Sequence, residues 1–331
     1  MNVCVYGGGN IAHSLAAKIS QTQPVTVITR RPTSWTRRLS FEQGGKVVES
    51  RFDVCATEDA RSVSAAGLIF VALPQFAIEE ALDRIVPYLN AGSTLAFVPA
   101  PARIVRYAEL LASRGINIVG FQRVPYISRI VEYGKAVKIS DNREVYRIVI
   151  SDSSLTGAWD ELCSLWFGGR AEYLSSFLTL AFSNSNPLLH PSRLVVLFKD
   201  WRHRIFPDNP PFYGEWTDES SELYIAADNE MHEVMSRYPI DLRKDYESVL
   251  DHYGVKTSSE LTCKLRSIPS FRMILSPMMQ TADGWVPDFN SRYFTEDVQF
   301  GLVEMLRLAE KVGVQVPTMR MLYDGVCNLR G

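Results

Sequence analysis

Twelve residues at the start of the chain leave few folds open, because an apolar strand runs directly into a glycine turn and then a helix. The strand begins at residue 2 and ends in Gly7-Gly8-Gly9, and Ala12 follows three places later. In this G-x-G-x-x-A spacing the first glycine permits the tight turn, the second lets a pyrophosphate approach the backbone, and the small alanine lets the helix pack on the strand. The helix, expected over residues 11–20, presents its N-terminal amides to phosphate. With a second strand over 24–29, we expect a dinucleotide site that includes Gly7, Gly9, Asn10, Ile11 and Ala12.

The end of the second strand indicates which dinucleotide binds. In NAD sites a carboxylate about 20 residues past the glycines accepts the ribose 2′-hydroxyl. Here the strand ends in Thr29-Arg30-Arg31, without a carboxylate. Guanidinium groups bind a 2′-phosphate bidentately, and Arg37 and Arg38 are expected to strengthen the local positive field. We therefore expect NADP(H) in preference to NAD(H), held by Thr29, Arg30 and Arg31. The alternative is a solvated basic loop.

The alternation of apolar strands and helices continues after this turn. Strands are expected over residues 66–73, 93–98 and 117–121, and helices over 76–89 and 104–114. Such an alternation is typical of a doubly wound parallel sheet, which binds its ligands beyond the carboxyl ends of the strands. Pro74 follows one of these strands. It either lines the cofactor groove or only ends the strand, as does the Val98-Pro99-Ala100-Pro101 segment.

The second half of the chain has a different pattern. Residues 131–150 are β-like and 155–167 are helical, but after about residue 175 the alternation stops. Helices are expected over 177–201 and 296–312 and in parts of 220–238 and 242–252. We therefore predict an α/β chain with a Rossmann domain over 1–175 and a mostly α-helical second domain over 176–331. The aromatic-rich stretch 206–216 is either a lid or a connection between helices.

Composition excludes several classes of protein. The 331 residues are 46% hydrophobic and 22% charged with a net charge of −2, which argues against a general binder of nucleic acid or of anionic membranes. The five cysteines are scattered without the spacing of metal ligands, and we expect reduced thiols and no metal. A strand that begins at residue 2 leaves no room for a signal peptide, so we expect a cytoplasmic protein. The oligomeric state stays open, with a homodimer as one expectation.

Among the five histidines (His13, His190, His203, His232 and His252), His190 stands out. It lies in Asn186-Pro-Leu-Leu-His-Pro191, and we expect the two prolines to rule out a regular helix there. Histidine is the usual general acid and base at neutral pH, although a core histidine bonded to backbone is also compatible with this pattern. Asn186 either orients a substrate carbonyl or caps a helix end.

A second polar cluster lies around residues 287–297. Thr295 is expected to cap a helix, with Glu296 and Asp297 in its first turn, where the helix dipole favours acids. Arg292 is suited to clamp a substrate carboxylate. Asp297 is suited either to this helix end alone or to fixing the tautomer of a histidine. The sequence does not show whether it contacts His190, which lies 107 positions away.

Taken together, these residues resemble the opine dehydrogenase family, the octopine and nopaline dehydrogenase group. The resemblance covers nearly the whole chain. It rests on Gly7-Gly-Gly-Asn-Ile-Ala12, Val71-Ala-Leu-Pro-Gln-Phe-Ala77, Pro125-Tyr126 with Arg129, Asn186-Pro-Leu-Leu-His-Pro191, Phe212-Tyr-Gly214, Ser291-Arg-Tyr-Phe-Thr-Glu-Asp-Val298 and Phe300-Gly-Leu302. Such enzymes join an amino acid to a 2-oxo acid and reduce the resulting imine with NAD(P)H. The resemblance implies that His190 is the catalytic acid and base, Asp297 its partner, and Arg292 the group that binds the oxo-acid carboxylate.

Two other readings remain. A ketopantoate-reductase-like or 2-hydroxyacid dehydrogenase would reduce a free carbonyl, but the ketopantoate enzymes use a lysine in the first long helix of the second domain, and residues 175–196 contain none. The other is a catalytically silent NADP(H)-binding sensor. The presence of His190, Arg292 and Asp297 argues against it.

Overall fold

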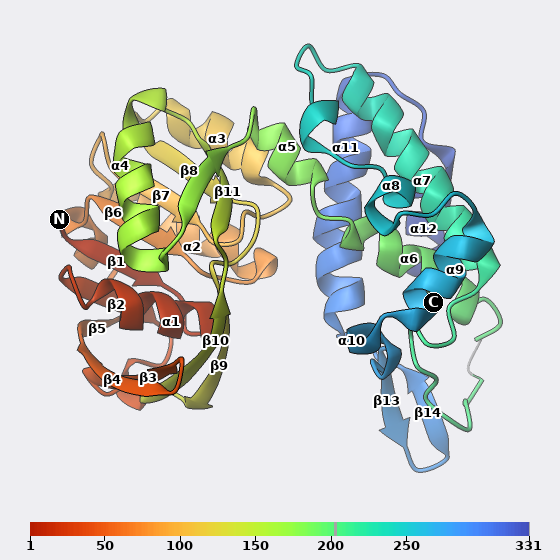
Figure 1. The fold of residues 1–331 in the computed structure, drawn as a ribbon, viewed down its shortest axis with the longest axis horizontal. Helices are drawn as coiled ribbons and strands as arrows, with labels where there is room; N and C mark the ends of the chain where they lie inside the picture. Colours follow the sequence, from red (N-terminus) through yellow and green to blue (C-terminus); the bar gives the residue numbers. More distant parts are fainter. Residues whose placement is uncertain (202–203, 331) are drawn as a thin grey trace. The chain divides into compact units, whose positions relative to one another are not determined.

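The computed structural model describes residues 1–201 and 204–330, which form two compact units, Met1–Ala181 and Phe182–Gly331 (Figure 1). The sequence places the domain boundary after residue 175, where the βα alternation stops. In the structure helix α5 (Phe177–Phe182) crosses from the first unit into the second. His203 lies outside the described residues.

An eight-stranded sheet forms the centre of the first unit. Its strand order is β12-β11-β8-β7-β6-β1-β2-β5, and every neighbouring pair is parallel except β8 with β11. The strands are β1 (Val3–Tyr6), β2 (Val25–Thr29), β5 (Asp53–Ala56), β6 (Leu68–Val71), β7 (Thr94–Phe97), β8 (Asn117–Phe121), β11 (Val145–Ile150) and β12 (Arg170–Tyr173). This order, which reverses beside β1, confirms the doubly wound Rossmann sheet predicted from the sequence.

The central strands are buried on both faces, which explains their continuous apolar runs. On one face Phe70 packs against Trp159, Trp166 and Phe167, with ring centroids 6.0–6.4 Å apart. On the other face Phe97 stacks on Tyr107 of α3. The helices of this unit are α1 (Asn10–Ile19), α2 (Ile78–Ile85), α3 (Ile104–Ala112) and α4 (Thr156–Leu162), the last continued by a π-helical turn over Cys163–Phe167. Short 3₁₀ turns cover Pro32–Ser34, Ala60–Ala65, Gln75–Ala77, Val86–Tyr88 and Ser153–Leu155.

A second, four-stranded sheet in this unit was missed from the sequence. Its order is β4-β3-β10-β9, formed by β3 (Arg38–Gln43), β4 (Lys46–Arg51), β9 (Tyr126–Glu132) and β10 (Ala136–Asn142). Helix α1 contacts all four of these strands as well as β1 and β2 (Figure 1). The helix that follows the glycine turn is therefore held between two sheets.

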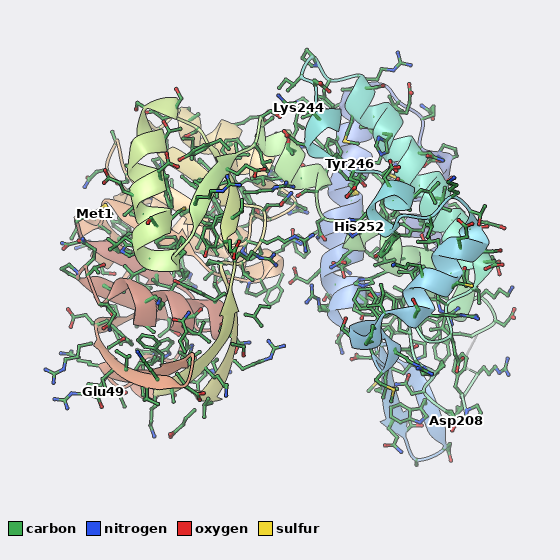
Figure 2. The ribbon with its side chains drawn as sticks, viewed as in Figure 1. Met1, Glu49, Asp208, Lys244, Tyr246 and His252 are labelled. Atoms are coloured by element: carbon green, nitrogen blue, oxygen red, sulfur yellow. The ribbon has the colours of Figure 1, made fainter. Side chains whose placement is uncertain are left out.

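The second unit is mostly helical, as predicted. It contains α6 (Asn186–Leu197), α7 (Asp218–Ser236), α8 (Val249–Tyr253), α9 (Ser258–Ser267), α10 (Pro269–Arg272), the π-helix η8 (Tyr293–Leu302), α11 (Val303–Lys311) and α12 (Pro317–Asn328), with a 3₁₀ turn at Arg243–Asp245 and a hairpin of β13 (Met278–Thr281) and β14 (Gly284–Pro287). Polar side chains join its helices: the Tyr246 hydroxyl, labelled in Figure 2, donates a hydrogen bond to Asp228 on α7 (2.7 Å). Across residues 1–201 and 204–330 we find no helix with the length and apolar character needed to cross a membrane.

Candidate active site

The glycine turn between β1 and α1 has the conformation that its spacing predicts. Gly7 has a φ of +149°, and a Cβ there would collide with the carbonyl oxygen of Ala72. Ala12 is fully buried, which lets α1 lie close to the strand. Among the described residues, no atom would lie within 4 Å of a Cβ on Gly9. The turn therefore leaves its backbone accessible at the position where a pyrophosphate approaches a Rossmann helix.

A cavity of about 410 Å³ lies beyond the carboxyl ends of β1, β2 and β6. Of the expected cofactor residues, the following line it: Gly7, Gly9, Thr29, Arg30, Arg31 and Pro74. Asn10, Ile11 and Ala12 form the first turn of α1 and are not among the residues that line the cavity. The Asn10 side chain accepts a hydrogen bond from the backbone N–H of Ile130 (2.8 Å), and Ile11 packs on the hydrophobic core. The cavity lies where a Rossmann fold binds a dinucleotide, and arginines on its lining supply cationic groups for phosphate.

Arg31 lies at the mouth of this cavity beside Tyr133, which comes from the turn between β9 and β10. The Arg31 guanidinium lies 5.4 Å from the centre of the Tyr133 ring, and Thr29 accepts a hydrogen bond from the Arg31 backbone N–H. Tyr133 was missed from the sequence because nothing there indicated that the second sheet reaches the glycine turn. Its hydroxyl lies only 2.6 Å from the position of a Cβ on Gly8.

The charges around this cavity differ in two ways from what the end of β2 alone indicates. Arg37 and Arg38 do not line it but line a separate cavity of about 490 Å³ beside the amino ends of β1 and β2. The reason is the 3₁₀ turn over Pro32–Ser34, after which β3 begins at Arg38. In addition, the neighbouring strand β5 brings the carboxylate of Glu58 into the cofactor cavity, although β2 itself ends without one.

His190 lies within α6, so the expectation that its prolines interrupt the helix is wrong. Pro187 occupies the first turn of α6, where a backbone N–H has no partner within the helix. Pro191 lies inside the helix and removes one donor without ending it. The helical position leaves His190 4% exposed and directs its ring into the second unit.

Both ring nitrogens of His190 have side-chain partners. Nδ1 lies 2.7 Å from Oδ2 of Asp297, and Nε2 lies 2.8 Å from the hydroxyl oxygen of Tyr213. The ring of Tyr293 stacks on the imidazole with a centroid distance of 3.9 Å. The fold thus brings together His190 and Asp297, as the sequence could not show. Tyr213 and Tyr293 were missed, and their only sequence signal was their presence in two of the motifs that carry the family resemblance.

Asp297 reaches His190 from the π-helix η8, not from a capped first turn. The helix begins near Arg292, so Thr295 lies inside it and donates a hydrogen bond to the carbonyl of Ser291 instead of acting as the N-cap. A Cβ on Gly301 would lie 2.8 Å from Cβ of Pro187, so only glycine lets η8 and α6 approach this closely. Asp297 is 2% exposed, and π-helical segments are frequent at functional sites.

The two expected substrate-binding residues lie at the starts of the two helices that carry this pair. Arg292 is exposed at the start of η8. Burial raises the pKa of Tyr293, whereas the hydrogen bond with Tyr213 and the charge of Arg292 oppose that rise. Asn186 is half-buried at the first position of α6, one helical turn before His190 and therefore on the same side of the helix.

The stretch 206–216 connects α6 to α7 and is packed into the second unit. Phe212, Tyr213 and Trp216 are at most 4% exposed, and the backbone N–H of Phe212 bonds to the carbonyl of Ile274. Asp208, labelled in Figure 2, belongs to the same connection. No cluster of three or more histidine, cysteine, aspartate or glutamate side chains suited to a metal ion occurs in the described part of the chain.

Comparisons with known proteins agree with this architecture. Residues 173–329 match the family model described as NAD/NADP octopine/nopaline dehydrogenase, alpha-helical domain, and residues 2–96 match NADP oxidoreductase coenzyme F420-dependent. The opine dehydrogenase of Haliotis discus hannai is 26% identical over 96% of this chain and 87% of its own.

Two solved structures have the same fold. Octopine dehydrogenase with NADH and pyruvate has a TM-score of 0.84 at 21% identity, over 100% of this chain and 89% of the other. Yersinopine dehydrogenase with NADP⁺ has a TM-score of 0.73 at 14% identity, over 99% and 90%. The second unit therefore has the α-helical domain of the NAD/NADP octopine/nopaline dehydrogenase family, and the protein is an NAD(P)-dependent oxidoreductase.

Proposed function

We propose that this enzyme joins an amino acid to a 2-oxo acid and reduces the resulting imine to a secondary amine dicarboxylate. The observation that carries the proposal is the buried pair of His190 and Asp297, 2.7 Å apart. The dinucleotide cavity and the similarity of the chain to opine dehydrogenases support it. NAD(P)H, when bound, supplies the hydride, so the protein must orient the reactants and manage protons.

The hydrogen bonds of His190 define its expected role. A carboxylate at Nδ1 favours the tautomer in which Nδ1 carries the proton, and it stabilises the imidazolium that forms when Nε2 accepts a second one. His190 can thus take a proton from the ammonium group of the amino acid, which frees the amine to attack the oxo carbon. The same proton, returned to the hydroxyl of the adduct, lets it leave as water and gives the imine.

Arg292 and Asn186 are proposed to hold the oxo acid. A guanidinium binds a carboxylate through two parallel hydrogen bonds, which fixes orientation as well as adding affinity. Arg292 is exposed at the start of η8 and so remains accessible to a substrate carboxylate. Asn186 shares one side of α6 with His190, where its amide can orient a carbonyl.

For the cofactor, we propose a preference for NADP(H) over NAD(H). The guanidinium groups of Arg30 and Arg31 with the hydroxyl of Thr29 line the cavity at the end of β2, where the 2′-substituent of a bound dinucleotide lies in Rossmann folds. The carboxylate of Glu58 in the same cavity opposes this preference. Arg84 and Glu80 also line the cavity but pair with each other, so Arg30 and Arg31 against Glu58 leave the balance positive.

Oxidation of NADPH tests the reaction, followed by absorbance with a 2-oxo acid alone, with a pool of amino acids alone, and with both. The proposal predicts oxidation only when both substrates are present, and division of the pool then identifies the amine. Oxidation with the oxo acid alone would instead indicate a ketopantoate-type or 2-hydroxyacid reductase, which also needs a proton donor. Bound NADPH without turnover in any mixture would indicate a sensor.

A further inference from the structure

The hydroxyl of Tyr213 contacts Nε2 of His190, the ring nitrogen that does not bond to Asp297. Nε2 lies 2.8 Å from this oxygen, and the imidazole is 4% exposed and covered on one face by the ring of Tyr293. A substrate therefore cannot contact Nε2 in this arrangement unless Tyr213 moves or passes the proton on. This observation is independent of the family motifs, which assign no role to Tyr213.

Close packing of Tyr213 makes transfer of the proton through its hydroxyl a simpler alternative than movement of its side chain. Its ring stacks on Phe271 with a centroid distance of 4.5 Å and lies parallel to Trp216 at 5.9 Å. It is 4% exposed, and the backbone on its N-terminal side is fixed by a bridge between Pro211 and Leu275. The packing thus fixes the position of the hydroxyl, which contacts Nε2 of His190 and also shares a hydrogen bond with the side chain of Tyr293.

The direction of the hydrogen bond between His190 and Tyr213 must follow the charge of the imidazole. When His190 is neutral with its proton on Nδ1, Nε2 is an acceptor and the Tyr213 O–H donates to it. When His190 is protonated, Nε2–H donates to the Tyr213 oxygen, and the Tyr213 O–H is released to point elsewhere. Burial raises the pKa of Tyr213, so its phenolate does not accumulate near neutral pH.

We propose that Tyr213 is the terminal catalytic residue of a proton relay that runs from Asp297 through His190 to the substrate. The relay rests on the proposed function. In the dehydration step the Tyr213 O–H bond breaks as its proton passes to the hydroxyl of the adduct, the C–O bond breaks, and water leaves. At the same time Tyr213 takes the Nε2 proton of His190, which returns to its neutral form beside Asp297. Deprotonation of the substrate ammonium is the reverse transfer.

Kinetics of Tyr213→Phe test the relay, because phenylalanine keeps the ring and removes only the hydroxyl. We expect kcat to fall by about 10²–10⁴-fold, as when a general acid is removed, with the Kd for NADPH unchanged. The matched control is Tyr238→Phe, which also removes a partly buried hydroxyl of the second unit, one that bonds to the carbonyl of Leu308. A kcat for Tyr213→Phe within fivefold of that control overturns the relay.

The ¹⁵N signals of His190 provide a readout that requires no substrate. For the neutral imidazole of the wild type we expect a protonated Nδ1 and an unprotonated Nε2 that accepts a hydrogen bond, with the Nε2 signal shifted in Tyr213→Phe and unchanged in Tyr238→Phe. A wild-type His190 with its proton on Nε2 contradicts the relay. If the wild type joins no pair of substrates, the proposed function fails and the relay fails with it. If the wild type joins them and Tyr213→Phe does so equally well, only the relay fails.

Discussion

His13 and His190 are both buried, 0% and 4% exposed, and each ring nitrogen of both has a partner, yet their surroundings differ in kind. His13 bridges backbone groups: Nδ1 bonds to the carbonyl of Gly9 (2.9 Å), and Nε2 accepts from the N–H of Gly134 (2.9 Å). His190 lies between a carboxylate and a hydroxyl. Peptide groups do not act as general acids or bases at neutral pH, whereas a carboxylate and a phenol hydroxyl can accept or pass on a proton. The partners of a buried histidine therefore indicate its role better than its burial does.

The two histidines also serve different units. His13 ties the glycine turn of the cofactor cavity to the β9–β10 turn that carries Tyr133, and Trp35 packs against its ring at 4.0 Å. It fixes the shape of a site built largely from neighbouring residues. His190 belongs to a site assembled from distant parts of the chain, with Asp297 and Tyr213 107 and 23 positions away. We expect variants of the first to change stability and variants of the second to change turnover.

The largest expected effect is that of His190→Asn. Removal of the acid and base should lower kcat by about 10²–10⁴-fold, because Asn cannot carry the proton. Steady-state turnover, the NADPH Kd from fluorescence and the melting temperature measure the three relevant quantities. An equal loss of kcat per folded molecule in His13→Gln would remove the distinction between the two histidines.

The second effect is a pH dependence of stability that originates at His13. Burial lowers the pKa of His13 from its ordinary value of 6.5 to about 4, so between these pH values the unfolded chain binds a proton that the folded chain excludes. The free energy of unfolding therefore falls as the pH falls through this window, by on the order of 3 kcal/mol in total. Above pH 6.5 the full contribution of His13 to the free energy of unfolding is present.

Urea unfolding of the wild type and of His13→Gln, at pH 7 and at pH 5, isolates this contribution. Between pH 7 and pH 5 the free energy of unfolding should fall by about 2 kcal/mol more in the wild type than in the variant. Other titrating groups are common to both proteins and cancel in the comparison. Equal pH dependence in the two proteins would show that His13 is not held neutral in the folded state.

The third prediction concerns the pairing of Asp297 with His190. Asp297→Asn removes the charge that stabilises the imidazolium and should lower kcat by less than the about 10²–10⁴-fold expected for loss of the acid and base itself. In the His190→Asn background the same change should have little further effect, because residues that act as one unit are not additive. Turnover of the two single variants and the double variant measures this coupling, and independent losses that multiply would contradict the pair.

The smallest effect expected is a change in cofactor choice. Arg31→Gln should raise the Kd for NADPH by about tenfold or more, since a charged hydrogen bond is worth about 1.5–3 kcal/mol, and should leave that for NADH nearly unchanged. Arg38→Gln is the matched control, because Arg38 lines the separate cavity beside the amino ends of β1 and β2. Equal weakening of NADPH and NADH binding by Arg31→Gln would contradict a 2′-phosphate contact.

The first unit was predictable where its information is local. The glycine turn and most of the strands and helices around it have a signal in a short stretch of sequence. Strands β1, β2, β6, β7 and β8 were predicted, whereas β5 and β12 were not. The β3–β4 hairpin also had a local signal, because Gly44 and Gly45 both adopt the positive φ of a tight hairpin turn between alternating residues. That signal was overlooked. The distance of Arg38 from the cofactor cavity follows from this hairpin and was missed with it.

The second unit was predictable only in outline, because its site depends on packing between distant segments. Proline patterns suggested a break at His190, but Pro187 falls in the first turn and Pro191 costs one hydrogen bond that the buried packing of α6 offsets. Thr295 had the chemistry of a cap, yet the helix began earlier and became a π-helix that turns Asp297 toward His190. No short stretch of the sequence indicates the contact between Tyr213 and His190.

The most direct test of the account is whether the enzyme forms a carbon–nitrogen bond. A mixture of 2-¹³C-labelled oxo acid, ¹⁵N-labelled amino acid and NADPH deuterated at the transferred position can be followed by NMR in the wild type and in His190→Asn. We predict a wild-type product in which one carbon is coupled to ¹⁵N and carries deuterium, formed far more slowly by the variant. A deuterated 2-hydroxy acid without a ¹³C–¹⁵N coupling would contradict the account.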